Sequence, residues 1–505
     1  MRYSILSMLC VVLLGVGVAN AQTLKTNQPV LAPVAVEQFY AQTSDSTVWI
    51  KDSQYDGLIA ALQGLEAHGL NPEHYHLSRL MALKDDAGAR DRLATEAWFS
   101  AAAHMLYGKL DPVSVEPDWT AAGRQADLAA VLKQALADDA VAMSLGQFAP
   151  MQDEYKALVA EYARLKTLAD VPITPVPEGD VLKPKNTGAR VMALQTRLVE
   201  LGLLETADIT GTMDETTDLA VKTFQGGAGL DEDGVVGAAS LAALNRGLHV
   251  QLDQVRVNLE RWRWLPADLG RRHLRANIAD FNVTAWADGE LQRTHLTIVG
   301  KQFRKTPVFS DAIGYAVFNP WWETPNSLAR RDKLPTFQRD PGAVERLGFQ
   351  ILDRSGTQVN ASTIDWNEVS ASNFPYRIRQ KPGAQNALGQ VKIMFPNQHN
   401  VYLHDTPTRG LFAQRQRAFS SGCLRTQDPI DLTAWLLEET PEWTRERIDS
   451  VLAGGKETRA NLASKVPVHI LYFTNVSEQD GFIRYLDDIY QRDQAVLNGL
   501  RAQPR

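Results

Sequence analysis

The sequence predicts a multidomain α+β protein with a helical N-terminal scaffold domain, a small three-helix bundle and a mainly-β C-terminal domain. Three observations support this fold class. Apolar residues recur at helical spacing up to about residue 168, three short helical segments fill residues 180–246, and alternating apolar residues with hairpin turns follow from about residue 252. A chain of 505 residues is long enough for about three such domains.

Residues 1–21 have the features of a secretory signal peptide, so we expect the mature protein to be exported. Ile5 to Val18 is almost wholly apolar, and Ala19-Asn20-Ala21 fits the cleavage pattern. The apolar run is too short for a membrane span, so no transmembrane anchor is expected after cleavage. A retained anchor is the alternative. A lipoprotein is a weaker one, because Leu9 precedes Cys10 where a small residue is expected.

The composition is that of a globular protein, with 44% hydrophobic and 22% charged residues and a net charge of −7. A nucleic-acid-binding surface is usually basic, so this charge argues against nucleic acid as a partner. We expect neither a cofactor nor a metal. His74 and His76 could form half a metal site, but we favour a solvated turn after Asn71-Pro72.

Residues 35–170 are predicted to form the helical scaffold domain. Leu58, Leu62 and Leu65 follow helical spacing, and Gly69 is a plausible stop. Tyr155, Leu158, Tyr162 and Leu165 form a second helical stripe, which we expect to lie in the core. This part of the chain shows no catalytic constellation.

A proline-rich linker precedes the small bundle at residues 180–246. Pro172, Pro175 and Pro177 predict a semi-extended spacer. In the bundle, Gly202 ends a first helix and Asp214 can cap a second. The unit resembles the peptidoglycan-binding domain type 1 family, which implies attachment to the cell wall; a helical spacer is the alternative. The matching residues are Leu194-Gln195, Leu201-Gly202, Gly211, Ala220-Val221, Phe224-Gln225, Gly229-Leu230, Asp233-Gly234 and Gly237.

Residues 252–500 are predicted to form the mainly-β domain. Asp288-Gly289 is a strong hairpin signal between two alternating segments. Val391–Phe395 and Val401–Leu403 predict a second hairpin, and Val466–Phe473 is a long β-rich run. Asp428 and Pro429 fit the first positions of a helix that runs to about Leu437, and another helix is expected near the C-terminus.

Cys423 would be the only cysteine of the mature chain, because Cys10 lies in the signal peptide. A lone thiol cannot form an internal disulfide, so we interpret Cys423 as a nucleophile. Such a thiol needs a nearby base. His404 is the best candidate, because it ends the apolar strand Val401–Leu403 at the rim of the sheet.

The neighbours of the thiol suit acyl chemistry. The backbone at Ser421 and Gly422 could stabilise an oxyanion, since Gly422 permits a close approach. Arg425 could bind a substrate carboxylate; a surface salt bridge is its alternative. Tyr402 lies two residues before His404 and therefore on the same face of the strand, where it could position the oxyanion or belong to the core.

These residues resemble the signature of the L,D-transpeptidase catalytic domain, or YkuD family. The signature appears here as His404-Asp405-Thr406 and Ser420-Ser421-Gly422-Cys423-Leu424-Arg425. Two upstream segments, Asn319–Leu328 and Lys381–Gly389, resemble its substrate-side motifs, which implies that Asn319 and Trp322 bind substrate. Many members carry histidine where Ser421 stands. The layout resembles the large Gram-negative branch of the family, which has a scaffold domain, a wall-binding domain and a capping insertion.

The resemblance implies a periplasmic enzyme that joins peptidoglycan stem peptides by 3→3 cross-links through a cysteine thioester, with carbapenems as inhibitors. It also implies that a backbone carbonyl, not the Asp405 side chain, orients His404. Cell-wall synthesis proteins are candidate further partners. An L,D-carboxypeptidase and a non-catalytic wall-binding protein are the alternatives. A D,D-transpeptidase would need Ser-x-x-Lys, which the sequence lacks.

The segment from about residue 327 to residue 379 is long, polar and poorly periodic, and lies between two motif segments. Loops of this length are usually functional or disordered. We expect it to form a mobile cap over the Cys423 site.

Overall fold

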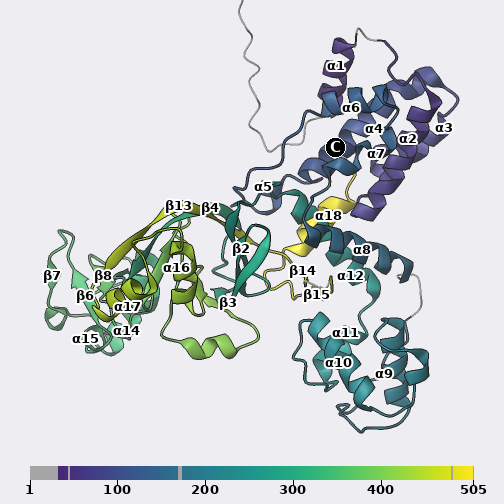
Figure 1. The fold of residues 1–505 in the computed structure, drawn as a ribbon. Coiled ribbons are helices and arrows are strands. Elements are labelled where there is room, and N and C mark those ends of the chain that lie inside the picture. Colours follow the sequence, from purple (N-terminus) through teal and green to yellow (C-terminus); the bar gives the residue numbers. More distant parts are fainter. Residues whose placement is uncertain (1–31, 44–45, 169–172, 479–480, 504–505) are drawn as a thin grey trace, which may run out of the picture.

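A computed structural model describes residues 32–43, 46–168, 173–478 and 481–503. It shows a helical body, a small three-helix bundle and a β domain that ends in the cap (Figure 1). The predicted signal peptide and Cys10 lie outside the described residues. Within the described ranges, no helix combines the length and apolarity needed to cross a bilayer.

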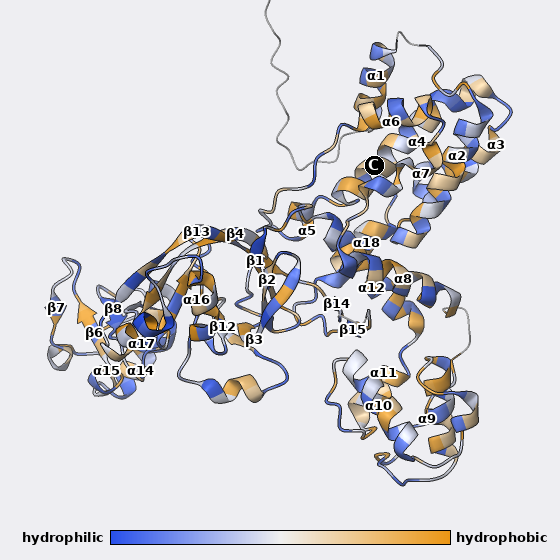
Figure 2. Cartoon of the chain, in the orientation of Figure 1, coloured by the Kyte–Doolittle hydropathy of each residue, from blue (hydrophilic) through white to orange (hydrophobic). Residues whose placement is uncertain are grey.

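The helical body is built on amphipathic helices whose hydrophobic and hydrophilic residues lie side by side along the ribbon (Figure 2). The stripe from Tyr155 to Leu165 is buried, and Gly69 ends a helical turn in the left-handed conformation, both as predicted. The helices are α1 (Ala32–Gln42), α2 (Asp52–Gly64), α3 (Leu77–Ala82), α4 (Ala87–Tyr107), α5 (Pro112–Val115), α6 (Leu128–Ala137), α7 (Val141–Ser144) and α8 (Asp153–Leu168).

Two later helices also belong to this body. Helix α12 (Leu248–Arg263) packs along α8, and α18 (Asp493–Arg501) packs on α12. The predicted start of the β domain at residue 252 therefore falls within a helix of the helical body. The reason is tertiary: Leu252, Val255 and Leu259 bury an apolar face against elements distant in sequence.

The expectation of a solvated turn at His74 is wrong. Its side chain is only 6% exposed, and its Nδ1 lies 2.7 Å from Lys109 Nζ. Lys109 Nζ also donates to the carbonyl oxygen of Leu500, at 2.7 Å. The lysine thus brings the C-terminal helix onto the turn and covers the histidine.

The small bundle contains α9 (Ala189–Glu200), α10 (Glu215–Gly227) and α11 (Ala238–Leu244), in agreement with the three predicted helices. Asp214 caps α10 by accepting a hydrogen bond from the Thr217 N–H, at 2.9 Å. Two buried glutamines make the same contacts in each half. Gln195 accepts from the Gly211 N–H, and Gln225 accepts from the Gly234 N–H. These contacts give a structural reason for the Leu-Gln and Phe-Gln pairs of the sequence pattern.

The described part of the linker is not a free spacer. Val176 is 1% exposed and belongs to the core of the small bundle. Its N–H donates to Asn245 Oδ1, and the Asn245 amide donates back to the Val176 carbonyl oxygen. The prolines extend the backbone, and this pairing fixes it to the bundle.

The β domain is organised around a closed ring of strands in the order β2, β1, β13, β4, β9, β10, β12 and β3, with β3 pairing again with β2. Strand β11 adds to β3 outside the ring. The strands are β1 (Arg272–Asn277), β2 (Asn282–Ala287), β3 (Glu290–Gly300), β4 (Phe309–Phe318), β9 (Val391–Met394), β10 (Leu403–His404), β11 (Ala418–Ser420), β12 (Leu424–Thr426) and β13 (Thr458–Leu471).

Local sequence signals set several of these elements. Asp288 and Gly289 both have positive φ and form the tight turn between β2 and β3, as predicted. The second predicted hairpin pairs β9 with β10. Pro429 opens α16 (Pro429–Leu437), while Asp428 occupies the cap position without a side-chain cap bond. Helix α17 (Arg445–Ala453) and the hairpin β14 (Asn475–Ser477) and β15 (Ile483–Tyr485) complete the domain.

The cap is a folded unit with its own core. Phe337, Phe349, Trp366 and Ile378 form a cluster of buried residues within it. The sequence appears poorly periodic because the elements are very short. They are β5 (Trp322–Glu323), α13 (Asn326–Leu328), α14 (Leu334–Arg339), α15 (Ala343–Arg346), β6 (Phe349–Leu352), β7 (Gln358–Val359) and β8 (Arg377–Gln380).

Candidate functional site

Cys423 lies in the tight connection between β11 and β12, and both strands pair with β3. Ser420 lies opposite Gly300 in the β11–β3 pair, and Arg425 lies opposite Ile298 in the β12–β3 pair. The segment around the thiol is therefore held on both sides by one strand. Cys423 is the only cysteine among the described residues.

Three hydrogen bonds fix the backbone around the thiol. Ser420 Oγ accepts from the Gly422 N–H at 3.0 Å and donates to the Cys423 carbonyl oxygen at 2.6 Å. Thr306 Oγ1 donates to the Gly422 carbonyl oxygen at 2.9 Å. Gly422 has a φ of 120°, which strongly favours glycine. The Gly422 N–H is thus already bonded to Ser420 in this structure.

His404 is brought beside this loop by strand pairing. It ends β10, which runs parallel to β12 and places His404 opposite Arg425. Its Nδ1 lies 2.5 Å from the Asp405 carbonyl oxygen. A carbonyl only accepts, so Nδ1 carries the proton and Nε2 is left as the ring's acceptor. The orienting group is a backbone carbonyl, as the family resemblance implied.

Cys423 and His404 line one pocket of about 450 Å³, together with Ser421, Tyr402, Arg425 and Trp322. The Tyr402 and His404 rings have centroids 5.6 Å apart, as expected for two residues on one face of a strand. The opposite wall comes from the cap, which contributes Ser327, Leu328, Arg331, Asp332 and Lys333.

Asn319 is not part of this pocket. It lines a neighbouring one, with Asp405 and Arg409. Its side-chain amide donates to the Val451 carbonyl oxygen at 2.9 Å and lies within 3.4 Å of two further backbone carbonyls. Its φ of 49° is a left-handed conformation that asparagine tolerates. Its side chain therefore holds the end of β4 against the last turn of α17 and the loop that follows it.

Burial favours the neutral form of both Cys423 and His404. Burial raises the pKa of the Cys423 thiol, and Tyr402, Lys392 and Arg425 oppose this rise. Burial and then the Arg425 charge lower the pKa of His404 to about 3. The thiol donates to the Asn400 carbonyl oxygen, at 3.6 Å. Both pKa shifts favour a resting pair of thiol and neutral imidazole.

Two basic residues of the site were missed from the sequence. Lys392 lies opposite His404 across β9 and β10, with its Nζ 4.0 Å from the centroid of the Tyr402 ring. A lone lysine within the apolar strand Val391–Phe395 could have indicated from the sequence that Lys392 belongs to the site. Arg304 donates to Ser421 Oγ at 2.9 Å and pairs with Asp332 of the cap at 3.0 Å. It lies in an irregular loop that carries no pattern.

A half-buried thiol, an oriented histidine and a cap over both define a candidate thiol-based enzyme site, and comparison with known proteins gives its class. Residues 271–448 match the family described as "L,D-transpeptidase catalytic domain". Residues 34–161 match "Scaffold domain", and residues 187–244 match "Putative peptidoglycan binding domain". The chain therefore carries an L,D-transpeptidase catalytic domain, together with a scaffold domain and a peptidoglycan-binding type 1 domain.

A curated relative from Haemophilus influenzae, named "Putative L,D-transpeptidase", is 39% identical over 220 residues. The match spans 44% of this chain and 44% of the relative's own length. Two solved structures are also similar. The L,D-transpeptidase (residues 123–326) of Xylanimonas cellulosilytica shows 16% identity and a TM-score of 0.18, covering 58% of this chain and 99% of that one. The L,D-transpeptidase of Stackebrandtia nassauensis shows 12% identity and a TM-score of 0.20, covering 59% and 97%.

A neutral resting pair predicts how Cys423 responds to a simple alkylating reagent. The thiolate fraction sets the rate, so the rate of modification by iodoacetamide should rise about tenfold per pH unit from pH 6 to 8, because the thiol pKa is raised. Intact-mass spectrometry of the time course measures this rate, and Cys423→Ala is the blank. A rate that is flat between pH 6 and 8 would instead indicate a preformed thiolate–imidazolium pair.

Proposed function

We propose that this protein is a cysteine-dependent L,D-transpeptidase that forms 3→3 cross-links between peptidoglycan stem peptides. The observation that carries the proposal is the geometry of one pocket. A lone thiol and a histidine share it, and a backbone carbonyl fixes the histidine tautomer with Nε2 free to accept a proton. The catalytic-domain match supports the same activity.

In the first step, the Cys423 sulfur attacks the carbonyl carbon of the third residue of a tetrapeptide stem. His404 Nε2 takes the thiol proton as the carbon–sulfur bond forms. The imidazolium then gives this proton to the leaving amine, and the amide bond breaks to release D-alanine. Burial makes imidazolium a strong acid, because it lowers the pKa of His404, and so favours this transfer.

The side chains around the thiol support binding of an anionic peptide. Arg304, Arg331, Lys333 and Arg425 all line the pocket. A stem peptide carries carboxylates, which guanidinium groups bind by paired hydrogen bonds. The Asp332 carboxylate in the same wall is already paired with Arg304.

The oxyanion of the tetrahedral intermediate needs a nearby donor. The Gly422 N–H donates to Ser420 in the resting site, so its use would require Ser420 to turn away. The Tyr402 hydroxyl interacts with the thiol, and burial raises its pKa, which keeps it protonated. We therefore assign Tyr402 as the main oxyanion donor.

In the second step, the side-chain amine of the third residue on another stem attacks the thioester carbonyl. The new amide bond forms the 3→3 link, and His404 manages the proton as the thiol is regenerated. Water in place of this amine would make the protein an L,D-carboxypeptidase. Product analysis with and without an acceptor amine separates the two activities.

The other domains suit an enzyme that works on an insoluble wall. The peptidoglycan-binding domain would keep the catalytic domain near its polymer. The predicted signal peptide would export the chain to the periplasm, where the wall lies. The helical body and the β domain share one continuous hydrophobic core, which would fix the position of one part relative to the other.

The cap would act as a lid on the donor peptide. It contributes one wall of the Cys423 pocket, and Arg304 links its Asp332 to Ser421 next to the thiol. Because the cap has its own core, it can move as a unit about its ends.

Covalent capture tests the nucleophile. A carbapenem should give one adduct per chain on the Ser420–Arg425 peptide, read by intact-mass and peptide mass spectrometry. Cys423→Ala should give neither adduct nor cross-linked product. His404→Ala should slow acylation by about 100-fold or more while the fold is kept, because general base catalysis typically contributes that much. Cross-links made by Cys423→Ala would refute the proposal, as would a wild-type thiol inert to both donor and lactam.

Deleting residues 180–246 tests whether the peptidoglycan-binding domain contributes to wall binding alone and not to catalysis. Binding to isolated sacculi should fall at least tenfold, while turnover of a soluble tetrapeptide should change less than about twofold. The reason is that the deletion lowers only the local concentration of the enzyme at the wall. Arg415, in the loop before β11, contacts this domain through the Gly229 carbonyl oxygen at 2.8 Å. Arg415→Ala removes this contact but keeps the domain, so it serves as the control for indirect effects of the deletion on the Cys423 site. Lost soluble activity in a folded deletion variant would mean that the domain shapes the site.

Hydrogen exchange tests the lid. Acylation of Cys423 should slow exchange across the cap, because the acyl group adds contacts to its wall of the pocket. Arg304→Ala should speed exchange in the unacylated protein by removing the link to Asp332. Arg346→Ala, which breaks an ion pair within the cap, is the matched control. Exchange unaffected by acylation would argue against the lid.

A further inference from the structure

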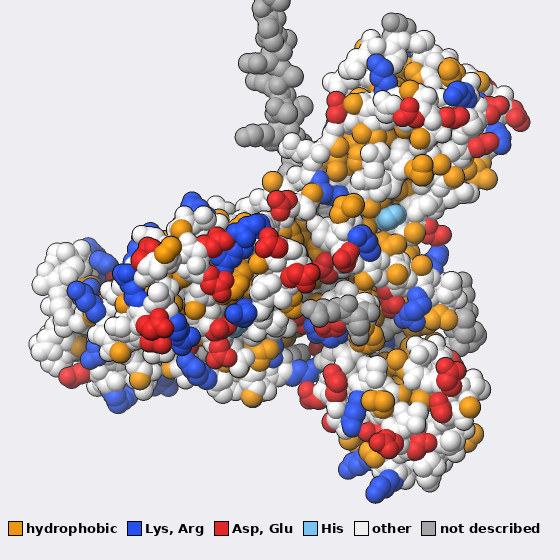
Figure 3. All heavy atoms as spheres, in the orientation of Figure 1, with side chains coloured by type: hydrophobic (Ala, Val, Ile, Leu, Met, Phe, Trp, Pro, Cys, Tyr) orange, Lys and Arg blue, Asp and Glu red, His pale blue; other side chains and the backbone are white. Residues whose placement is uncertain are grey.

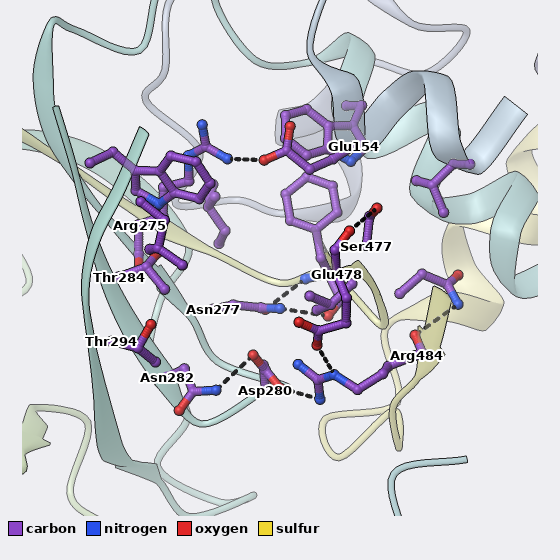
Figure 4. Close-up of a pocket in the computed structure, with 18 residues that line it drawn as sticks. Glu154, Arg275, Asn277, Asp280, Asn282, Thr284, Thr294, Ser477, Glu478 and Arg484 are labelled. Atoms are coloured by element: carbon purple, nitrogen blue, oxygen red, sulfur yellow. Dashed lines mark hydrogen bonds and ion pairs between the residues drawn. The ribbon is translucent and has the colours of Figure 1, made fainter. Parts of the chain in front are cut away.

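A second pocket of about 350 Å³ lies between the β domain and the helical body, and shares no lining residue with the Cys423 pocket. Strands β1, β2 and β3 form one wall, the β14–β15 hairpin forms the facing wall, and α8 and α12 close the end (Figure 4). Thr284, Thr294 and Asn282 lie on the strand side, across the cavity from Ser477 and Glu478.

All the charged side chains of this pocket are already paired, two arginines with three carboxylates, so that they carry one net negative charge. Arg275 pairs with Glu154 at 2.5 Å, and Arg484 pairs with Asp280 at 2.9 Å and also with Glu478. An ionic ligand would have to break one of these pairs and leave a partly buried charge unpaired, which is costly. The pocket is therefore suited to an uncharged ligand.

The remaining lining is aromatic, aliphatic and hydroxyl-bearing. The Trp262 and Phe473 rings pack with centroids 4.9 Å apart, and Arg275 covers the Trp286 ring at 4.1 Å. Around these rings lie the hydroxyls of Thr284, Thr294 and Ser477. Rigid ring surfaces beside neutral hydrogen-bonding groups fit a ligand that is flat, uncharged and rich in hydroxyls.

We propose that this pocket binds an uncharged N-acetylated sugar of the glycan strand. A sugar ring offers an apolar face to the Trp262 and Phe473 rings. The Thr284 and Ser477 hydroxyls already donate to backbone carbonyl oxygens, so they would accept hydrogen bonds from the sugar hydroxyls. The acetamido methyl group can pack against half-buried aliphatic lining residues such as Leu291 and Val476. The choice of polymer rests on the proposed function, whereas the preference for an uncharged saccharide rests on the pocket alone.

Strand β3 connects this pocket to the thiol. Thr294 lines the pocket, and Gly300, six residues along the same strand, pairs with Ser420 of the Cys423 motif. At about 3.3 Å per residue, this separation is roughly 20 Å. A glycan strand in the pocket would thus be held roughly 20 Å from the catalytic site and would not contact the reacting atoms. It would raise the local concentration of its stem peptides at the thiol.

The test uses the full-length protein and a soluble tetramer of N-acetylglucosamine, with binding followed by saturation-transfer NMR and calorimetry. Thr294→Glu places an unpaired charge in the pocket and should weaken binding at least tenfold. Trp286→Ala, which removes a ring from the lining, should also weaken it. Ser464→Glu puts the same charge on an exposed position of β13 and should bind like the wild type.

The readouts separate this inference from the proposed function. With sacculi as substrate, Thr294→Glu should raise the KM at least threefold with an unchanged kcat, while carbapenem acylation of Cys423 stays at the wild-type rate. Tetramer binding that Thr294→Glu leaves intact would overturn the inference, as would equal binding of a glucose tetramer without acetamido groups. Failure of Cys423 acylation in the wild type would overturn the proposed function alone.

Discussion

The pairing of strand β3 is the constraint on which the rest of the catalytic domain depends. Its first half pairs with β2 and closes the ring of strands, and its second half pairs with β12 and β11 on either side of Cys423. One strand therefore fixes both the closure of the ring and the position of the thiol. The bonds of Ser420 and Thr306 then set the backbone between β11 and β12 within that frame.

Local signals predicted the parts of the fold that are set locally. Asp288-Gly289 encodes a turn that few other residue pairs adopt, and Pro429 fixes the start of α16. Features that depend on long-range packing could not be predicted from the sequence in this way. The assignment of α12 to the helical body depends on contacts with α8, and the fold of the cap depends on very short elements that share a core. The helical spacing of Leu252, Val255 and Leu259 indicates a helix but not the body on which it packs, and the short elements of the cap leave no periodic pattern.

In the candidate site, too, some residues could be predicted from local sequence and others depend on tertiary packing. Cys423 and His404 could be named from a lone thiol and a strand-ending histidine, and they line one pocket. Asn319 lies within a motif-like segment, yet its amide is committed to backbone carbonyls, which only the tertiary structure reveals. Lys392 opposes the rise of the thiol pKa through its charge, and Arg304 bonds Ser421 beside the thiol; their positions depend on strand register and on an irregular loop.

The C-terminal helix has a consequence for how the chain is completed. The β domain is inserted between α12 and α18, and α18 is tied back by the Arg261–Asp493 ion pair at 2.6 Å and by Lys109. The helical body therefore cannot close until α18 has been synthesised and has packed on α12. A chain cut short after β13 would keep every strand of the ring but expose the part of α12 that α18 covers. Exposed apolar surface of this kind is what quality-control proteases and chaperones bind, so we expect such a chain to be recognised as unfolded although its ring of strands is complete.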